Sequence, residues 1–145
     1  MSDLVPVRVA VVDSGVHPDH PHVGRVAGGV GIAADGTEHP DFIDRLGHGT
    51  AVAAAIREKA PGSVIYAVKV FDRELSTSTE ALVAAIDWAA RSGARLINLS
   101  LGMANAAHAD LLRETVDRAA TNGALIVSAA ADGQTQWLPG SLPGV

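Results

Sequence analysis

The stretch that decides the fold class reads Val7-Arg8-Val9-Ala10-Val11-Val12 and runs directly into Asp13-Ser14-Gly15. A near-continuous β-branched run of this kind is typical of a strand buried on both faces of a sheet. Three further short apolar runs follow along the chain: Val64 to Phe71, Arg95 to Leu99 and Ala124 to Ala129. Together they indicate the strands of a parallel sheet.

Longer amphipathic segments separate these runs. Helices are expected over three segments: His48 to about Lys59, Thr77 to Gly93 and Asn105 to about Thr121. Pro61-Gly62 ends the first helix, and Thr77-Ser78-Thr79-Glu80 forms a capping box that opens the second. The residues expected to face inward are Leu82, Ile86, Ala89, Ala90, Leu112, Val116, Ala119 and Ala120. Residues 23–32 are a possible short strand, and residues 33–46 are interpreted as loop.

The alternation of strands and helices predicts an α/β fold, with a three-layer parallel sheet of about five strands flanked by helices. We expect one domain that spans residues 1–145. The composition agrees with this fold, because 48% of the 145 residues are hydrophobic while only 3% are aromatic. Ala and Val therefore fill the core, which suits helices that lie close against a sheet.

The composition also argues against several partners and sites. The net charge is −5 and no basic stripe stands out, so we expect no nucleic acid partner. Cysteine is absent, which excludes disulfides and thiolate metal sites. No segment approaches the roughly 18 apolar residues of a membrane span, so we expect no membrane partner. The start, Met1 to Pro6, has no signal-peptide pattern, from which we expect a cytoplasmic location.

Small or polar residues follow three of the strands, at the edge where parallel sheets form their sites. The segments are Asp13-Ser14-Gly15, Leu99-Ser100-Leu101-Gly102 and Ala129-Ala130-Ala131-Asp132. Asp13 taken alone is more often a turn residue than a catalytic one. His48 taken alone is more often a packed or solvated histidine, although the start of a helix favours the neutral imidazole that a general base needs.

Asp13 followed thirty-five residues later by His48, in Gly47-His48-Gly49-Thr50, resembles the subtilisin-like serine peptidases. Further segments resemble that family in the same order: Val9 to Val16, His20-Pro21, Ala60-Pro61, Val64 to Val70, Leu96 to Gly102, Ala124 to Asp132 and Leu138 to Val145. Because these segments are collinear and cover nearly the whole chain, the resemblance implies the N-terminal half of a subtilisin-like domain.

By this resemblance Asp13 would orient His48, and His48 would be the general base of a Ser-His-Asp mechanism. Ser100, Leu101 and Gly102 would form one wall of a groove that pairs with an extended peptide, as an added strand does. The opposite wall would be formed by Ala129, Ala130 and Ala131.

The sequence departs from the family in residues that complete the catalytic machinery. It contains no Gly-Thr-Ser-x-Ala motif, in which the family carries its nucleophilic serine. Asp132 stands at the position of the asparagine that donates to the oxyanion, and an ionised carboxylate would repel that charge. Ala51 replaces a second histidine. The short link from Arg57 to Ser63 leaves no room for a calcium loop found in many relatives, so we expect no calcium site.

His17, His20 and His22 form His-Pro-Asp-His-Pro-His, a pattern that could suit zinc or nickel. The prolines splay the side chains, and His20-Pro21 already has a counterpart in the family's motif. We therefore expect no metal site and no cofactor.

Two functions follow from the resemblance and its gaps. In the first, the chain is catalytically incompetent alone and acts as a peptide- or protein-binding accessory, for example in peptide maturation. In the alternative, it is one half of a split serine endopeptidase whose partner chain supplies the serine. The third hypothesis is that the chain is a degenerate fragment without a defined role.

The strand Ala124–Ala129 bears on both functions, because in the family the sheet continues beyond it. Here it would form an apolar edge, and such edges aggregate unless they are covered. We expect a cover from the chain's own tail with Trp137 and Leu138, from a second copy in a homodimer, or from a different protein.

Overall fold

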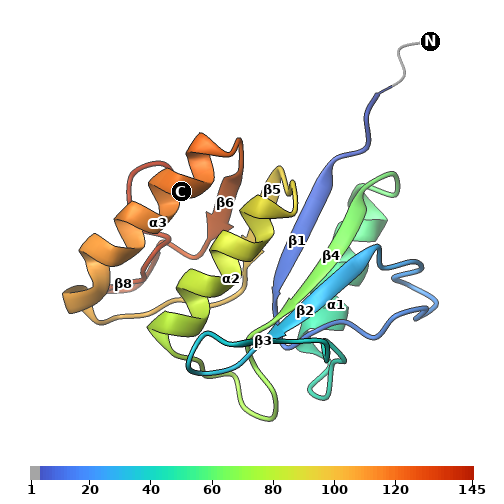
Figure 1. Cartoon of the computed structure of the whole chain (residues 1–145), viewed down its shortest axis with the longest axis horizontal. Coiled ribbons are helices and arrows are strands. Elements are labelled where there is room, and N and C mark those ends of the chain that lie inside the picture. The colour runs from blue at the N-terminus through green and yellow to red at the C-terminus, as the bar shows by residue number, and fades with distance from the viewer. Residues whose placement is uncertain (1–3) are drawn as a thin grey trace.

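The computed structural model describes residues 4–145 and shows a mostly parallel, six-stranded sheet with the order β3-β2-β4-β1-β5-β6 (Figure 1). The strands are β1 (Arg8–Asp13), β2 (Gly28–Ile32), β3 (Glu38–His39), β4 (Val64–Lys69), β5 (Leu96–Leu99) and β6 (Leu125–Ser128). β1 pairs in parallel with β4 on one side and with β5 on the other. The predicted α/β fold with a parallel sheet is confirmed.

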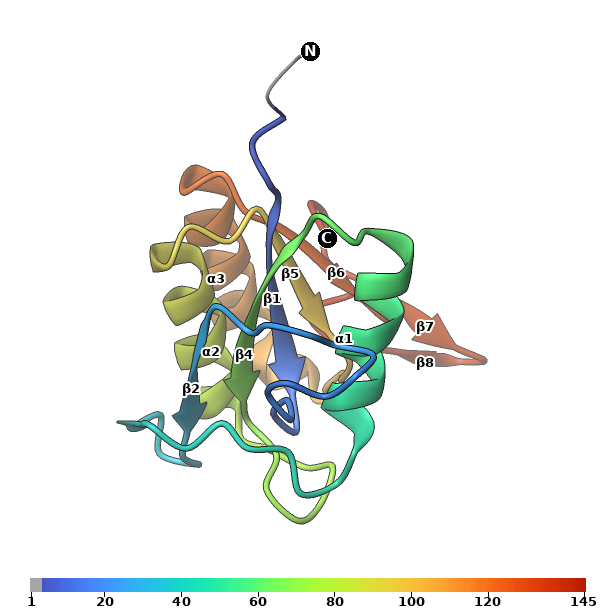
Figure 2. The ribbon, with the colours of Figure 1, turned by 90° about the vertical axis from the view of Figure 1, so that its right-hand side faces the viewer.

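Helices cover both faces of the sheet (Figure 2). α1 (His48–Lys59) lies on one face, and α2 (Thr79–Arg91) and α3 (Ala109–Thr121) lie on the other. Between its ends, Arg8 and Asp13, the first strand is apolar because its residues alternate between these two layers. Ala10 and Val12 pack in the larger core, under α2 and α3, whereas Val11 packs in the smaller core, under α1.

The strand count and the loop prediction need one correction. Residues 33–46, expected to be loop, contain β3, which pairs antiparallel with β2 through Gly31 and Ile32. A two-residue strand is too short to show an alternating pattern, so periodicity could not reveal it. The sheet therefore has six strands rather than about five.

The first helix begins at His48 as predicted, whereas the starts of the other two differ by a few residues from the predicted ones. Ser78, not Thr77, is the N-cap of α2, because its hydroxyl accepts a hydrogen bond from the backbone N–H of Ala81. Asn105 does cap a helical turn, but that turn is a short 3₁₀-helix, η1 (Ala106–His108), and α3 begins after it.

The predicted inward faces of α2 and α3 are correct except at Ala120, which is exposed, while Thr115 is fully buried. The Thr115 hydroxyl donates to the backbone oxygen of Leu111, so this polar side chain is satisfied inside its own helix.

β6 lies at an edge of the sheet, as expected, and its side chains Leu125 and Val127 are each 52% exposed. The tail reaches the carboxyl end of this strand. It forms a hairpin of β7 (Ala131–Asp132) and β8 (Thr135–Gln136), and then Leu138 forms an antiparallel bridge with Met103. Coverage of β6 by a second copy or a different protein stays a prediction.

No helix within residues 4–145 is long and apolar enough to cross a membrane. Met1 to Asp3, the first three residues of the stretch without a signal-peptide pattern, lie outside the described residues.

Candidate active site

Asp13 and His48 meet in the structure. Asp13 is fully buried at the carboxyl end of β1, and His48 is the first residue of α1. The Nδ1 atom of His48 lies 2.9 Å from each carboxylate oxygen of Asp13. A carboxylate accepts, so Nδ1 carries the proton and donates it, and Nε2 is left with a free lone pair. The side chain of His48 is 44% exposed, which leaves that lone pair open to a reacting group.

The glycines beside His48 make this approach possible. A Cβ atom at Gly49 would lie 2.0 Å from the backbone oxygen of Gly15 and 3.2 Å from the Asp13 Cβ. Helix α1 can therefore come this close to the end of β1 only because residue 49 has no side chain. Gly47, the N-cap of α1, has φ of 90°, a left-handed conformation that favours glycine.

A buried lysine fixes the loop that leads to α1. Lys69, at the carboxyl end of β4, is 4% exposed, and its Nζ donates to the backbone oxygen of Ile43 at 2.8 Å. The same Nζ forms a 2.8 Å ion pair with Asp72, and hydrogen bonding from Lys69 lowers the pKa of that carboxyl. Ile43 lies five residues before His48, so this contact anchors the loop close to the dyad.

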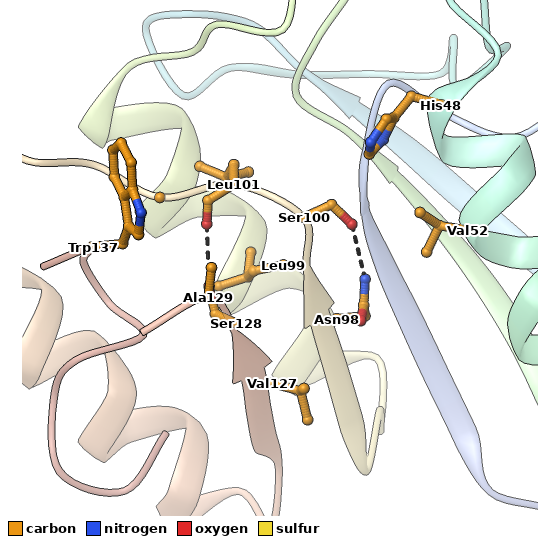
Figure 3. Close-up of a pocket in the computed structure, with 11 residues that line it drawn as sticks. His48, Val52, Asn98, Leu99, Ser100, Leu101, Val127, Ser128, Ala129 and Trp137 are labelled. Carbon is orange, nitrogen blue, oxygen red and sulfur yellow. Dashed lines mark hydrogen bonds between the residues drawn. The ribbon is translucent and has the colours of Figure 1, made fainter. Parts of the chain in front are cut away.

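A cavity of about 580 Å³ opens beside His48, at the carboxyl ends of β5 and β6 (Figure 3). Its lining residues are His48, Val52, Asn98, Leu99, Ser100, Leu101, Gly102, Val127, Ser128, Ala129 and Trp137. His48 and Val52 lie on one side, and Trp137 lies on the opposite side, next to Leu101.

Hydrogen bonds brace the wall that follows β5. The Ser128 hydroxyl donates to the backbone oxygen of Leu101, and the Asn98 side-chain amide donates to the Ser100 hydroxyl. Trp137 packs against the backbone of Gly102, where a Cβ would lie 2.6 Å from the Trp137 Cβ. The wall is therefore held from β6 and from the tail.

The structure brings only some of the predicted residues into this cavity. Ser100, Leu101, Gly102 and Ala129 line it together with His48. Ala130 and Ala131 do not, because the Ala130 oxygen accepts from Trp137 and Ala131 pairs with Gln136 in the hairpin. Asp132 is exposed in that hairpin and is not a lining residue. The roles assigned to these residues stay predictions.

Sequence reasoning missed five lining residues: Val52, Asn98, Val127, Ser128 and Trp137. Asn98 carried a signal, because an amide inside an otherwise apolar buried strand needs a polar partner. Val52 and Trp137 carried none, since an apolar residue on a helix or in a tail does not indicate which surface it contacts.

The three histidines of the loop after β1 lie near one another without forming a ligand set. The ring centroids of His17 and His20 are 6.5 Å apart, and those of His20 and His22 are 5.7 Å apart. Among residues 4–145, no group of three or more His, Cys, Asp or Glu side chains could hold a metal ion. The expectation of no metal site and no cofactor stays a prediction.

Comparison with known proteins identifies the family. The family model of the subtilases, peptidase family S8, matches residues 6–144. The chain belongs to the subtilase family. The match spans β1 with Asp13, α1 with His48, and the cavity between them and β6.

Individual subtilases resemble the chain over most of its length. It is 37% identical over 134 residues to a thermostable alkaline protease of Halalkalibacterium halodurans, covering 85% of this chain and 35% of that protein. It is 35% identical over 133 residues to a subtilisin of Bacillus pumilus, covering 86% of this chain and 46% of that protein. The crystal structure of a lanthipeptide protease superposes with a TM-score of 0.82 at 26% identity, covering 95% of this chain and 46% of that chain.

The chain therefore spans less than half the length of the subtilases that it matches. The sequence of 145 residues contains the aspartate and histidine motifs of the family and no Gly-Thr-Ser-x-Ala motif.

Proposed function

We propose that the chain binds extended peptide segments in the cavity beside His48. The observation that supports this most directly is the wall from Ser100 to Gly102, which follows β5 without being part of the sheet. Within residues 4–145 the backbone groups of Ser100 and Gly102 have no backbone hydrogen-bond partner. An extended peptide can therefore pair with them as an added strand, while its side chains enter the cavity that Leu101 and Trp137 line.

A titration tests peptide binding. Blocked tetrapeptide amides with small, aliphatic, aromatic or charged central residues are added to the full chain, and backbone amide signals are followed by NMR. We expect shifts at Ser100, Leu101 and Gly102 that saturate with one of these peptides. Shifts spread evenly over the surface, or none at millimolar peptide, would refute the proposal.

Gly102→Val is the variant expected to lose peptide binding, because a side chain at residue 102 would collide with Trp137 and distort the wall of the cavity. Ala130→Leu probes the predicted opposite wall. Gly62→Ala is the control, since it lies in a turn with no neighbour within 4 Å of an added Cβ. Unchanged binding in both Gly102→Val and Ala130→Leu would argue against the groove.

As a second candidate function, we propose that the chain is the half of a split serine endopeptidase that carries the general base, His48, and its partner Asp13. The intact hydrogen bond between His48 and Asp13 favours it, because a binding protein has no need of an oriented imidazole with a free Nε2. The partner's serine would attack the peptide carbonyl while its hydroxyl proton passes to Nε2 of His48. His48 would then return the proton to the leaving amine as the C–N bond breaks.

Covalent labelling distinguishes the two candidates. A polypeptide that contains a subtilase serine motif is mixed with this chain and treated with a fluorophosphonate. The second candidate predicts labelling of the partner's serine in the presence of this chain and no labelling with His48→Ala. Binding of peptide without labelling in any mixture supports the first candidate alone.

A partner at the β6 edge is part of the second candidate. Leu125 and Val127 present apolar side chains on β6, whose outer edge pairs with no strand within residues 4–145, so a partner that adds a strand there buries both. The cytoplasmic setting and a role in peptide maturation stay predictions, which fractionation of the native cells and the identity of the bound peptide would test.

A further inference from the structure

Asp44 lies between β1 and α1 and accepts five hydrogen bonds. Its Oδ1 accepts from the Ser14 hydroxyl at 2.8 Å, from the Leu46 N–H at 2.9 Å and from the Gly47 N–H at 2.8 Å. Its Oδ2 accepts from the Thr50 N–H at 3.0 Å and from the Thr50 hydroxyl at 2.6 Å. Neither the cavity wall nor the Asp13–His48 pair explains so many bonds at this carboxylate.

These bonds secure the start of α1. The first backbone N–H groups of a helix have no partner inside the helix, and Gly47 at the N-cap has no side chain that could accept from them. Ser14 accepts from the Gly49 N–H at 2.9 Å, and Asp44 accepts from the Thr50 N–H. The negative charge of Asp44 also suits the positive end of the helix dipole.

The same bonds connect Asp44 to the dyad. The Ser14 hydroxyl donates to Asp44, and the Ser14 N–H donates to Oδ1 of Asp13 at 2.7 Å. Asp13 in turn accepts from Nδ1 of His48. Asp44 therefore holds both partners of the Asp13–His48 bond, one through Ser14 and the other through the first turn of α1.

The Asp44 carboxylate is ionised at neutral pH. Burial raises the pKa of Asp44, but hydrogen bonds from Thr50, Gly47 and Leu46 outweigh it and lower the pKa to about 2. Because Asp44 stays ionised, both of its oxygens remain acceptors for the five hydrogen bonds from the β1 end, the loop and α1.

We propose that Asp44 is a positioning residue for the Asp13–His48 pair, which holds the end of β1 and the start of α1 together so that Nδ1 of His48 faces the Asp13 carboxylate. The inference rests on the proposed function only in taking His48 as the base. Its test reads the imidazole directly and needs neither peptide binding nor hydrolysis, so the two can fail separately.

The test is the tautomer of neutral His48 in the full chain, read from ¹⁵N chemical shifts, together with the exchange of its Nδ1 proton with water. The wild-type chain is expected to hold the Nδ1–H tautomer. In Asp44→Ala we expect a mixture of the two tautomers and proton exchange about tenfold faster, because the charge-assisted bonds that orient the pair are lost.

Asp41→Asn is the matched control. Asp41 lies on the same loop and bonds to Arg45, to the Ile43 N–H and, in a 3.9 Å ion pair, to Lys69, but it has no bond to β1 or α1 within the described residues. We expect the tautomer and the exchange rate of His48 to be unchanged in this variant.

Ser14→Ala keeps the proposal testable if Asp44→Ala does not fold, because it removes the link to Asp44, together with the bond from the Gly49 N–H, and leaves the Thr50 bonds in place. The effects of Ser14→Ala and Asp44→Ala on proton exchange should be non-additive, since both break one chain of bonds. A pure Nδ1–H tautomer with wild-type exchange in a folded Asp44→Ala or Ser14→Ala chain would overturn the proposal.

Discussion

The two sides of the cavity are built in different ways. On the side of β1 and α1, Asp13 is fully buried, His48 bonds to it directly, and Gly49 lies against the backbone of Gly15. On the side of β6 and the tail, Val127 is half exposed and Asp132 lies exposed in a hairpin of two-residue strands. Contacts within this chain hold the side of β1 and α1, whereas the edge side, that of β6 and the tail, leaves Val127 and Asp132 exposed.

The largest expected effect is on stability, and it comes from replacing one glycine on each side of the cavity by alanine. Gly49→Ala places a Cβ 2.0 Å from the Gly15 backbone oxygen, so the end of β1 and α1 must move apart. We expect a loss of about 3 kcal/mol or more in the free energy of unfolding. In Gly133→Ala no atom lies within 4 Å of the new Cβ, and the positive φ of 58° alone should cost about 1 kcal/mol. Urea denaturation checks both, and equal losses would contradict the comparison.

The second prediction concerns the aromatic wall on the edge side. Trp137→Ala removes a half-buried ring that packs on Gly102 and should cost about 2 kcal/mol, less than a fully buried aromatic would. Val52→Ala removes a half-buried side chain from the opposite wall and should cost less than about 1 kcal/mol. Thermal unfolding of both variants measures the difference. A larger loss for Val52→Ala would show that the tail does not hold the wall.

The third prediction uses acid pH. The pKa of Asp44 is lowered from 3.8 to about 2, so its contribution to stability is present above pH 4 and is lost as the pH falls towards 2. Asp44→Asn should therefore be less stable than wild type above about pH 4, and the two should converge below about pH 2. Acid titration of the unfolding midpoint tests this, with Asp132→Asn, an exposed residue of the edge side, expected to follow the wild-type curve.

The smallest expected effect on stability is at Val127. Val127→Lys exchanges a half-exposed side chain at the sheet edge and should change the free energy of unfolding by less than about 0.5 kcal/mol. The same change should abolish any association through the β6 edge, because Lys is a residue that blocks strand pairing. Sedimentation velocity over a range of concentrations tests this. If the wild type associates and the variant associates equally, the interface lies elsewhere.

Much of this architecture could be predicted from the sequence. The run Val9 to Val12 indicated a strand buried on both faces, and the structure places its alternate residues in two cores on opposite faces of the sheet. The glycines around His48 indicated a close approach of the backbone, which Gly49 and Gly15 confirm. Both features depend only on residue type and on spacing within a short segment, and such information is present in the sequence.

Other features could not be predicted, because they depend on segments far apart in the chain. Trp137 contacts Gly102 only after the tail has folded back along Met103 and Leu138. Asp44 was interpreted as part of a loop, since nothing local indicates that its partners are Ser14, thirty residues earlier, and Thr50. The two-residue strand β3 is defined only by the register of β2.

The sequence by itself therefore determined the parallel sheet, which follows from periodicity, and it pointed to the Asp13–His48 pair through the resemblance of its motifs to those of the family. Only the tertiary structure decided that Asp44 holds this pair, that the tail forms a wall of the cavity and that Asp132 lies outside it. These three results depend on hydrogen bonds and contacts between distant segments, which exist only once the chain has folded.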